Sequence, residues 1–363
     1  MITFNEIIQE EGLFQDFVRE LAPLFKEPRF PNYLDDTFSE SREWKAVSAL
    51  NGRIPMASLI DQYSGKPIIG SEKPLDLFGE MPTFGNKVVF TSKEFNKIEA
   101  IERAISAQIA DPAQVIKYVK NYFERLVVGP LTAMDKLFYE AWSNGTSTVV
   151  SADNLSKLSM SIDWKIDKSY VSTVWGTAAT ATGLEDLKAL AKHMKDTYGV
   201  IVDRFTMNGN TLDLLLAQNS VKAALSSYFS MANGSSIKWT GTPSLEAVNT
   251  VLVSNFRLPP IVIEDHMISY YNNDGITVKK TEQAFKDGRV TASVGDMIGQ
   301  YMWTPADEQR RPDANVMYQD INHVLISKRG ERGKVTFESE LSAIPVPTLM
   351  DQMGILVTDA TSA

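Results

Sequence analysis

Apolar residues recur every three or four positions near the N-terminus and again between residues 91 and 143, a pattern that predicts helices with one buried face. Thr3 and Glu6 have the spacing of a capping box, and the apolar residues after them predict a helix of about 18 residues. Thr91 and Glu94 form a second capping box. A third helix is predicted over residues 112–143, roughly 45–50 Å long if Pro130 only kinks it.

Beyond residue 150 the spacing of apolar residues alternates between that typical of a helix and that typical of a strand. "SIDWKI" alternates apolar and polar residues as a strand does. Thr182 with Glu185 predicts a helix that ends at Gly199. A strand is predicted near residues 200–203, followed by a helix near Asn210. Residues 250–334 are mainly strand-like, with turns at 273–275 and 287–288 and a glycine hairpin near 330. With no alternating strand–helix–strand series, the pattern predicts an α+β fold and makes a dinucleotide-binding fold improbable.

Two stretches lack a period that would let them form a core. Residues 24–40 carry prolines and scattered aromatic residues and are predicted to be an extended arm that cannot bury its aromatic rings alone. Residues 51–90 contain Gly, Pro and short apolar pairs, and are predicted to be a long two-stranded excursion. A connection of forty residues is too long for an ordinary loop. We therefore expect it to pack on a neighbouring copy of the chain.

Composition narrows the class of protein. At 363 residues, 44% apolar and 22% charged, the chain is an ordinary folded protein with more than one packed unit. No apolar run approaches the roughly 20 residues that cross a bilayer, and the acidic N-terminus is unlike a signal peptide, so we expect a cytoplasmic protein with no membrane contact. The absence of cysteine excludes disulfides, and the net charge of −9, half of it in residues 1–50, argues against tight nucleic-acid binding.

Candidate chemistry is sparse. Glu264, Asp265 and His266 form the one cluster of acids with a histidine, which is compatible with a metal or general-base role. Adjacent strand residues point to opposite faces, which favours a solvated or locally hydrogen-bonded histidine instead. The sequence has no phosphate loop, nucleophile elbow or HExxH motif, and the basic run at 328–332 fits a solvated hairpin tip. We therefore predict no enzyme activity, no cofactor and no metal site.

The order of the segments is similar to that of a known family. "LFYEAWSNGTSTV" resembles the end of a long helix that turns into a strand, "LEDLKALAKHMKDTYGVIVDRFTMNGNTLDLLLAQ" a helix, strand and helix that open a second domain, and "KDGRVTASVGDMIGQY" a turn, strand and glycine-bearing loop. "FESELSAIPVPTLMDQMGILVT" resembles the closing segment. Together they resemble the HK97-fold major capsid proteins of tailed bacteriophages, in particular the lambda-type branch. One departure is Lys286, where family members often have proline.

The resemblance implies an HK97-like capsid fold with five segments. These are an N-terminal arm (1–50), an E-loop hairpin (51–90), a peripheral domain with a long spine helix (91–183), an axial domain (184–330) and a return to the peripheral domain (331–363). The turn and strand around Asp287 would then form part of the wall of the capsid shell, a structural role that needs no catalytic side chain. Two regions are expected to contact other subunits, the E-loop and the N-terminal arm. The candidate contact residues are Tyr63, Lys66, Ile68, Ile69, Leu75, Leu77, Phe78, Phe4, Phe14 and Phe17.

On this resemblance the function is to self-assemble into hexamers and pentamers that form the icosahedral head shell around phage DNA. The DNA is expected to be contacted weakly and non-specifically. The expected partners besides other copies are a separate scaffolding protein, a portal and a decoration protein. The expected location is the virion, after assembly in the host cytoplasm. Two alternatives stay open: an encapsulin-type shell that holds protein cargo, and a metal-dependent or hydrolytic enzyme that uses the 264–266 cluster.

Overall fold

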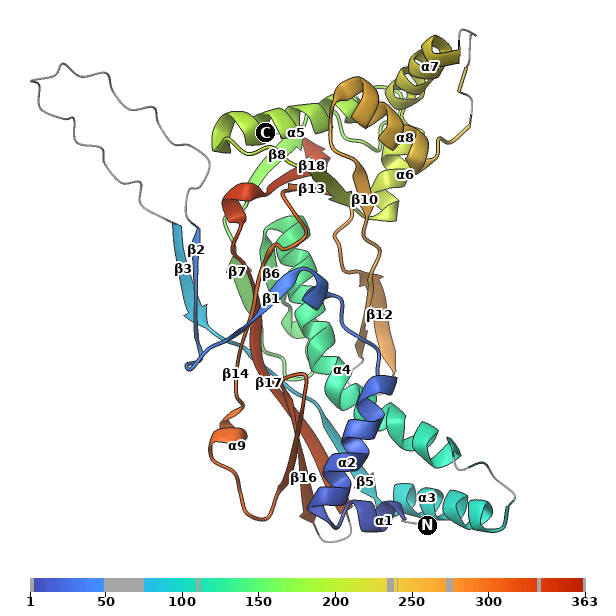
Figure 1. Cartoon of the computed structure of the whole chain (residues 1–363), viewed down its shortest axis with the longest axis vertical. Helices are drawn as coiled ribbons and strands as arrows, with labels where there is room; N and C mark the ends of the chain where they lie inside the picture. The colour runs from blue at the N-terminus through green and yellow to red at the C-terminus, as the bar shows by residue number, and fades with distance from the viewer. Residues whose placement is uncertain are drawn as a thin grey trace, which may run out of the picture. The chain divides into compact units, whose positions relative to one another are not determined.

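The computed structural model describes residues 3–48, 75–108, 111, 113–233, 238–239, 241–271, 277–331 and 334–361 (Figure 1). The chain divides into two compact units. Unit 1 contains residues 1–44, 79–135 and 300–345, and unit 2 contains residues 45–78, 136–299 and 346–363. The turn predicted at residues 273–275 lies outside the described residues. Of the hairpin predicted near residue 330, Gly330 lies within a strand (Val324–Glu331) and residues 332–333 lie outside the described residues. The strands on both sides of each turn are present.

Unit 1 is built on a seven-stranded sheet with helices beside it. The main path of the sheet runs β1–β14–β17–β16–β15, and β4 and β5 also pair with β17. The long strand β17 is therefore the centre of the unit, because it pairs with β16 over residues 334–340 and with β5 over residues 334–338. The elements are α1 (Phe4–Ile7), α2 (Glu11–Leu21), β1 (Leu34–Phe38), β4 (Thr83–Phe84), β5 (Lys87–Thr91), α3 (Ser92–Ser106), β14 (Gly299–Thr304), α9 (Asp307–Arg310), β15 (Met317–Ile321), β16 (Val324–Glu331) and β17 (Lys334–Pro347).

Both predicted capping boxes are present. Thr3 and Glu6 cap α1, and Thr91 and Glu94 cap α3. The N-terminal helix is shorter than predicted, because the chain turns at residues 8–10 and starts again as α2. In one straight helix, Phe4 and Phe17 would lie about 20 Å apart along the axis. The turn brings their ring centroids to 5.9 Å, so the helix is broken where two aromatic rings pack together.

The predicted long helix is α4 (Ala113–Asn144), 32 residues with Pro130 in its interior. Pro130 therefore does not end the helix, and Thr132 Oγ1 donates to the carbonyl oxygen of Val128 beside it at 2.8 Å. The helix ends at Gly145, whose φ of +66° is the left-handed conformation that glycine adopts at no steric cost.

Unit 2 holds a five-stranded sheet in the order β10–β9–β13–β18–β8. Strands β9 and β10 pair in parallel, as do β18 and β8, whereas β13 is antiparallel to both of its neighbours. The predicted strand near residues 200–203 lies slightly later, as β9. The elements are β6 (Thr146–Val149), β7 (Met160–Asp163), β8 (Asp167–Val171), α5 (Gly183–Tyr198), β9 (Arg204–Met207), α6 (Gly209–Ala217), α7 (Asn219–Asn233), α8 (Leu245–Val251), β10 (Ile261–Ile263), β11 (Met267–Tyr271), β12 (Val278–Gln283), β13 (Arg289–Ser293) and β18 (Gly354–Thr361).

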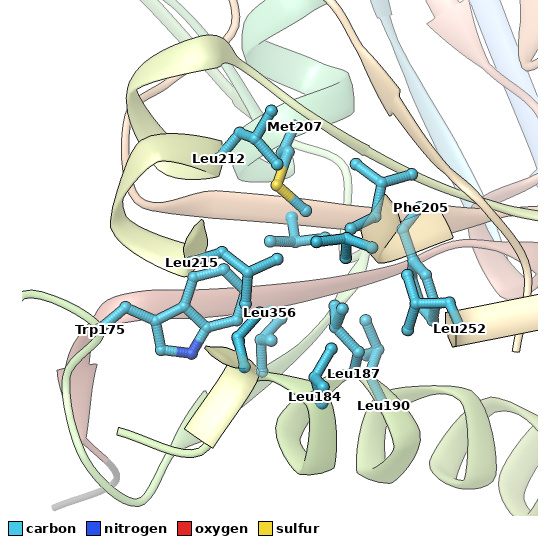
Figure 2. Packing of buried hydrophobic residues seen from close by; sticks show 14 of the residues in the cluster. Trp175, Leu184, Leu187, Leu190, Phe205, Met207, Leu212, Leu215, Leu252 and Leu356 are labelled. Carbon is cyan, nitrogen blue, oxygen red and sulfur yellow. The ribbon is translucent and has the colours of Figure 1, made fainter. Parts of the chain in front are cut away.

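The core of unit 2 lies between this sheet and its helices. Figure 2 shows Trp175, Leu187, Phe205 and Leu215 packed together, and all four side chains are 0% exposed. Helix α5 supplies Leu184, Leu187, Leu190 and Met194 from one face, as its apolar period predicts. The helix ends at Gly199 as predicted, but Thr182 makes no side-chain cap.

Candidate functional site

Strand β2 (Glu43–Ser48) precedes the predicted E-loop (51–90), strand β3 (Leu75–Glu80) lies within it, and the two pair as a two-stranded ribbon. One face of the ribbon is packed, since Trp44 is 4% exposed and a Cβ added at Gly79 would lie 2.9 Å from the Trp44 indole. The backbone N–H of Met81 donates to the carbonyl oxygen of Arg42 at 2.6 Å, which ties the two strands together where they enter unit 1. We call this end, residues 42–44 and 79–81, the root of the ribbon.

The other face of the ribbon is in solvent. Phe78 is 81% exposed, and Lys45 and Glu80 are exposed as well. Leu77 is half-buried. Solvation of a whole phenylalanine ring is unfavourable, so Phe78 is the strongest candidate for a contact residue on the described part of the ribbon.

The remaining E-loop candidates have no described side chain. Tyr63, Lys66, Ile68 and Ile69 lie in residues 49–74, outside the described residues, and only the backbone of Leu75 is described.

The candidate contact residues of the N-terminal arm pack within unit 1 and not on a surface open to another subunit. Phe4 is 2% exposed and Phe14 is 0% exposed, and both rings pack inside unit 1. Phe14 lies 5.9 Å from Phe337 and 6.3 Å from Phe123, and Phe17 lies 6.0 Å from Phe123. The rings of Phe4 and Phe14 are therefore covered by their own chain and leave no surface for another subunit.

The prediction that residues 24–40 cannot bury their aromatic rings within their own chain is also wrong for Phe30. Phe30 is 2% exposed and its ring centroid lies 4.6 Å from that of Tyr301. The buried carboxylate of Asp135 accepts the backbone N–H groups of Arg29 at 3.0 Å and Phe30 at 2.8 Å. Sequence periodicity missed this packing because the partners lie on α4 and β14, about 100 and 270 residues away.

The side chains of the predicted acid–histidine cluster make hydrogen bonds and ring contacts with other parts of the chain. Tyr139 donates its hydroxyl proton to Glu264 at 2.6 Å, and the Tyr139 ring also lies 5.5 Å from the His266 ring. Asp265 lies elsewhere, accepting the backbone N–H of Gly209 at 2.8 Å. The predicted alternation therefore holds for these side chains, although residues 264–266 are not part of a strand. His266 is not solvated, since it is 6% exposed. Among the described residues, no group of three His, Cys, Asp or Glu side chains could hold a metal ion.

The described helices include none that is both long and apolar enough to span a membrane. Neither a protein-family model nor a curated protein matches the sequence. Solved structures do match it. A protein assigned as the capsid protein of a prophage of E. coli CFT073 superposes with a TM-score of 0.53 at 9% identity, over 96% of this chain and 98% of that one. The capsid asymmetric unit of cyanophage A-1(L) gives a TM-score of 0.50 at 10% identity, over 93% of both chains. The chain has the HK97-like capsid fold.

Unit 2 also carries exposed apolar side chains. Ile201 is 76% exposed and Met297 is 39% exposed. Their loops are held together, since Asp203 accepts the backbone N–H of Gly295 at 2.8 Å and Arg204 forms an ion pair with Asp296. Sequence reasoning missed the link between these loops because no local pattern relates residues 203–204 to residues 295–296.

A second exposed region of this HK97-like chain is the β11–β12 hairpin. Met267 is 48% exposed and Val278 is 56% exposed. Lys279 and Lys280 bind the two carboxylate oxygens of Asp153 at 2.9 and 2.7 Å. Hydrogen bonds from these lysines lower the pKa of Asp153, so the ion pairs fix the hairpin to the loop after β6.

Proposed function

We propose that the chain is the shell subunit of a phage head, which assembles into hexamers and pentamers around the genome. The observation that carries the proposal is the likeness to the prophage capsid structure over 96% of this chain and 98% of that one, which leaves little of either chain for another function. In this proposal unit 1, which contains the N-terminal part of α4, corresponds to part of the peripheral domain, and residues 184–299 of unit 2 to the axial domain. Residues 300–330, which the sequence assigned to the axial domain, belong to the sheet of unit 1.

The proposed mechanism is burial of the ribbon on a neighbouring subunit. Phe78 and the E-loop beyond it would lose their water on contact, and each Å² of apolar surface contributes about 25 cal/mol before association costs. A ring of six subunits needs heterologous contacts, in which one surface meets a different surface of the next copy. A ribbon with an exposed aromatic ring suits that arrangement, because its own chain leaves most of the Phe78 ring uncovered.

The partners and the location follow from the same proposal. A scaffolding protein would set the size of the shell, a portal would occupy one vertex, and a decoration protein would bind outside. The mature location would be the virion. The net charge of −9 supports weak contact with the packaged DNA, because like charges keep the polymer from adhering.

Electron microscopy and size-exclusion chromatography with light scattering test the proposal. We expect the purified chain to form ring oligomers or shells. A variant with residues 63–78 replaced by a short Gly-Ser linker should stay folded and fail to assemble. A folded chain that stays monomeric at every concentration, with or without a scaffolding protein, would overturn the proposal. Particles that contain a protein cargo in place of DNA would favour the encapsulin alternative.

A further inference from the structure

A cavity of about 340 Å³ lies in unit 1, on one face of the sheet. Carboxylates of three residues line it: Glu308 on α9, and Glu338 and Glu340 on β17. Lys87 is the one described lining residue with a positively charged side chain. A partly enclosed cavity with an excess of negative charge favours a cation over an anion or a neutral molecule.

The register of the strands places the polar groups of the cavity on one face. On β17, Glu338 lies opposite Ser327 of β16 and Lys87 of β5. Glu340 lies opposite Leu325 of β16. Residues directly opposite each other in antiparallel strands share a face, and diagonal neighbours lie about 7–8 Å apart. Ser327 and Glu340 are such diagonal neighbours, so one donor group between them can reach both, since each hydrogen bond spans about 2.8–3.0 Å.

The hydroxyl group of Ser327 has no hydrogen-bond partner among the described residues, although the residue is 4% exposed and lines the cavity. Buried hydroxyl groups in folded proteins usually have a partner. This observation is independent of the charges around the cavity. It indicates a ligand that donates a hydrogen bond to the free hydroxyl oxygen.

Two of the three cavity carboxylates are balanced by cations. Lys87 Nζ lies 2.7 Å from Glu338, and Arg329 pairs with both Glu308 and Glu338. Two cations and two carboxylates give this group no net charge. The position of Lys87 also shows that a primary ammonium group fits against this wall of the cavity.

The third carboxylate, that of Glu340, is not balanced. It pairs with Arg42 Nη2 at 3.5 Å, but the same nitrogen lies closer to Asp307, at 3.1 Å. One cation therefore serves two carboxylates, which leaves one negative charge in this group. Glu340 is the member of the group that lines the cavity, so one added monovalent cation beside it would neutralise the group.

The other lining residues favour an organic cation over a metal ion. In the part of the chain that the structure describes, no group of three His, Cys, Asp or Glu side chains could hold a metal ion. Leu325, 3% exposed, and the half-buried Phe84 line the cavity and offer apolar surface to an alkyl chain. An ammonium group is compact and carries three donors, which suits acceptors in different directions better than a planar guanidinium does.

We propose that this cavity binds a primary alkylammonium group, which donates hydrogen bonds to Glu340 and Ser327 while its alkyl chain contacts Leu325 and Phe84. The ammonium group comes from a free short-chain amine or from a lysine side chain of another protein chain. The site belongs to unit 1 itself and does not depend on the proposed function.

Ligand-observed NMR titration of the full chain, in one oligomeric form and at low salt, tests the site with n-butylammonium chloride as the probe. We expect saturable binding with a dissociation constant of about 10 mM or lower. The neutral control is n-butanol, which has the same alkyl chain without the charge. It should bind at least about tenfold more weakly.

Four variants separate the contributions to binding of n-butylammonium. Glu340→Gln should weaken it about tenfold or more, because the unbalanced charge is removed. Ser327→Ala keeps every charge and should weaken it about threefold or more. Lys87→Met removes a cation from the lining and should strengthen it about twofold or more. Asp16→Asn, which removes an exposed carboxylate on α2, should leave the affinity unchanged.

Nα-acetyl-lysine amide distinguishes the two sources of the ammonium group. Binding as tight as that of n-butylammonium would assign the site to lysine side chains of other chains. Binding about tenfold weaker would assign it to free amines. Both results support an ammonium site.

Absence of saturable binding by n-butylammonium would overturn the proposal, as would equal affinity for n-butanol. A folded Glu340→Gln protein with the wild-type affinity would also overturn it. If Glu340→Gln does not fold, Ser327→Ala decides in the same way, because it leaves the ion pairs intact. These measurements need no shell, so they fail or succeed separately from the microscopy that tests the proposed function.

Discussion

Replacement of Phe78 by serine should separate assembly from folding. The residue is 81% exposed, so its ring contributes little to the core of its own chain. If an aromatic side chain presents about 200 Å², then about 160 Å² of it is free to be buried by a neighbour. At about 25 cal/mol per Å² that surface corresponds to about 4 kcal/mol per contact, as an upper bound. Loss of the ring should weaken each contact by roughly two to three orders of magnitude.

Two measurements on purified Phe78→Ser follow from this estimate. Light scattering as a function of concentration should show that assembly needs more subunit than the wild type, by up to about a thousandfold. Thermal unfolding should change little, because exposed substitutions usually alter stability by no more than about 0.5 kcal/mol. Glu80→Ser is the matched control, since Glu80 is exposed two residues along the same strand face. It should assemble at close to the wild-type concentration.

Either of two results would refute the reasoning. Wild-type assembly by Phe78→Ser would mean that the ring makes no contact between subunits. A drop of several degrees in the melting temperature would mean that the ring belongs to the core, in conflict with its 81% exposure.

Three further substitutions test the packing of the two units. Phe14→Ala should destabilise unit 1 by about 3–5 kcal/mol in denaturant unfolding, whereas Leu24→Ala, at a half-exposed position, should cost far less; equal effects would contradict the burial of the N-terminal helix. Gly85→Ala should cost about 2 kcal/mol or more, because its Cβ would lie 2.2 Å from a carbonyl oxygen of β17, while Gly12→Ala, in open space on a helix, should not destabilise. Asp153→Asn should speed hydrogen exchange in the β11–β12 hairpin at pH 7. Because the pKa of Asp153 is lowered, its stabilisation is present above about 3.8 and is lost as pH falls further, so wild type should match the variant only in stronger acid.

Local signals in the sequence were sufficient for several elements. The Thr91–Glu94 capping box and the apolar stripe of residues 112–143 identified α3 and α4, and Gly199 ends α5 as predicted. These features depend on contacts within four residues along the chain, which a sequence displays directly. The same holds for the turn at Asp287 and Gly288, since Gly288 has a φ of +67° ahead of β13.

Other features depend on distant partners, and the sequence could not reveal them. The break between α1 and α2 follows from the packing of Phe4 on Phe17 and on rings from β5 and α3. The turn between β15 and β16 uses Asn322 and His323 at φ values of +51° and +66°, where a glycine would be the usual signal. His323 stacks on Trp303 at 3.8 Å and approaches Asp36 at 2.8 Å. These contacts help to explain why the uncommon conformation persists without glycine.

Phe14 and Phe78 illustrate why a contact surface is harder to predict than a fold. Both are phenylalanines that the sequence offered as contact candidates, yet one is 0% and the other 81% exposed. Helical period correctly assigned Phe14 to a buried face, but it could not tell whether this chain or a neighbour covers that face. In the structure, Phe337 of β17, more than 300 residues away, covers it. Strand alternation likewise places the side chains of Phe78 and Leu77 on opposite faces of the strand, without showing which face is covered. Assembly residues are therefore those whose pattern predicts burial and whose own chain supplies no cover, a property that only the folded subunit reveals.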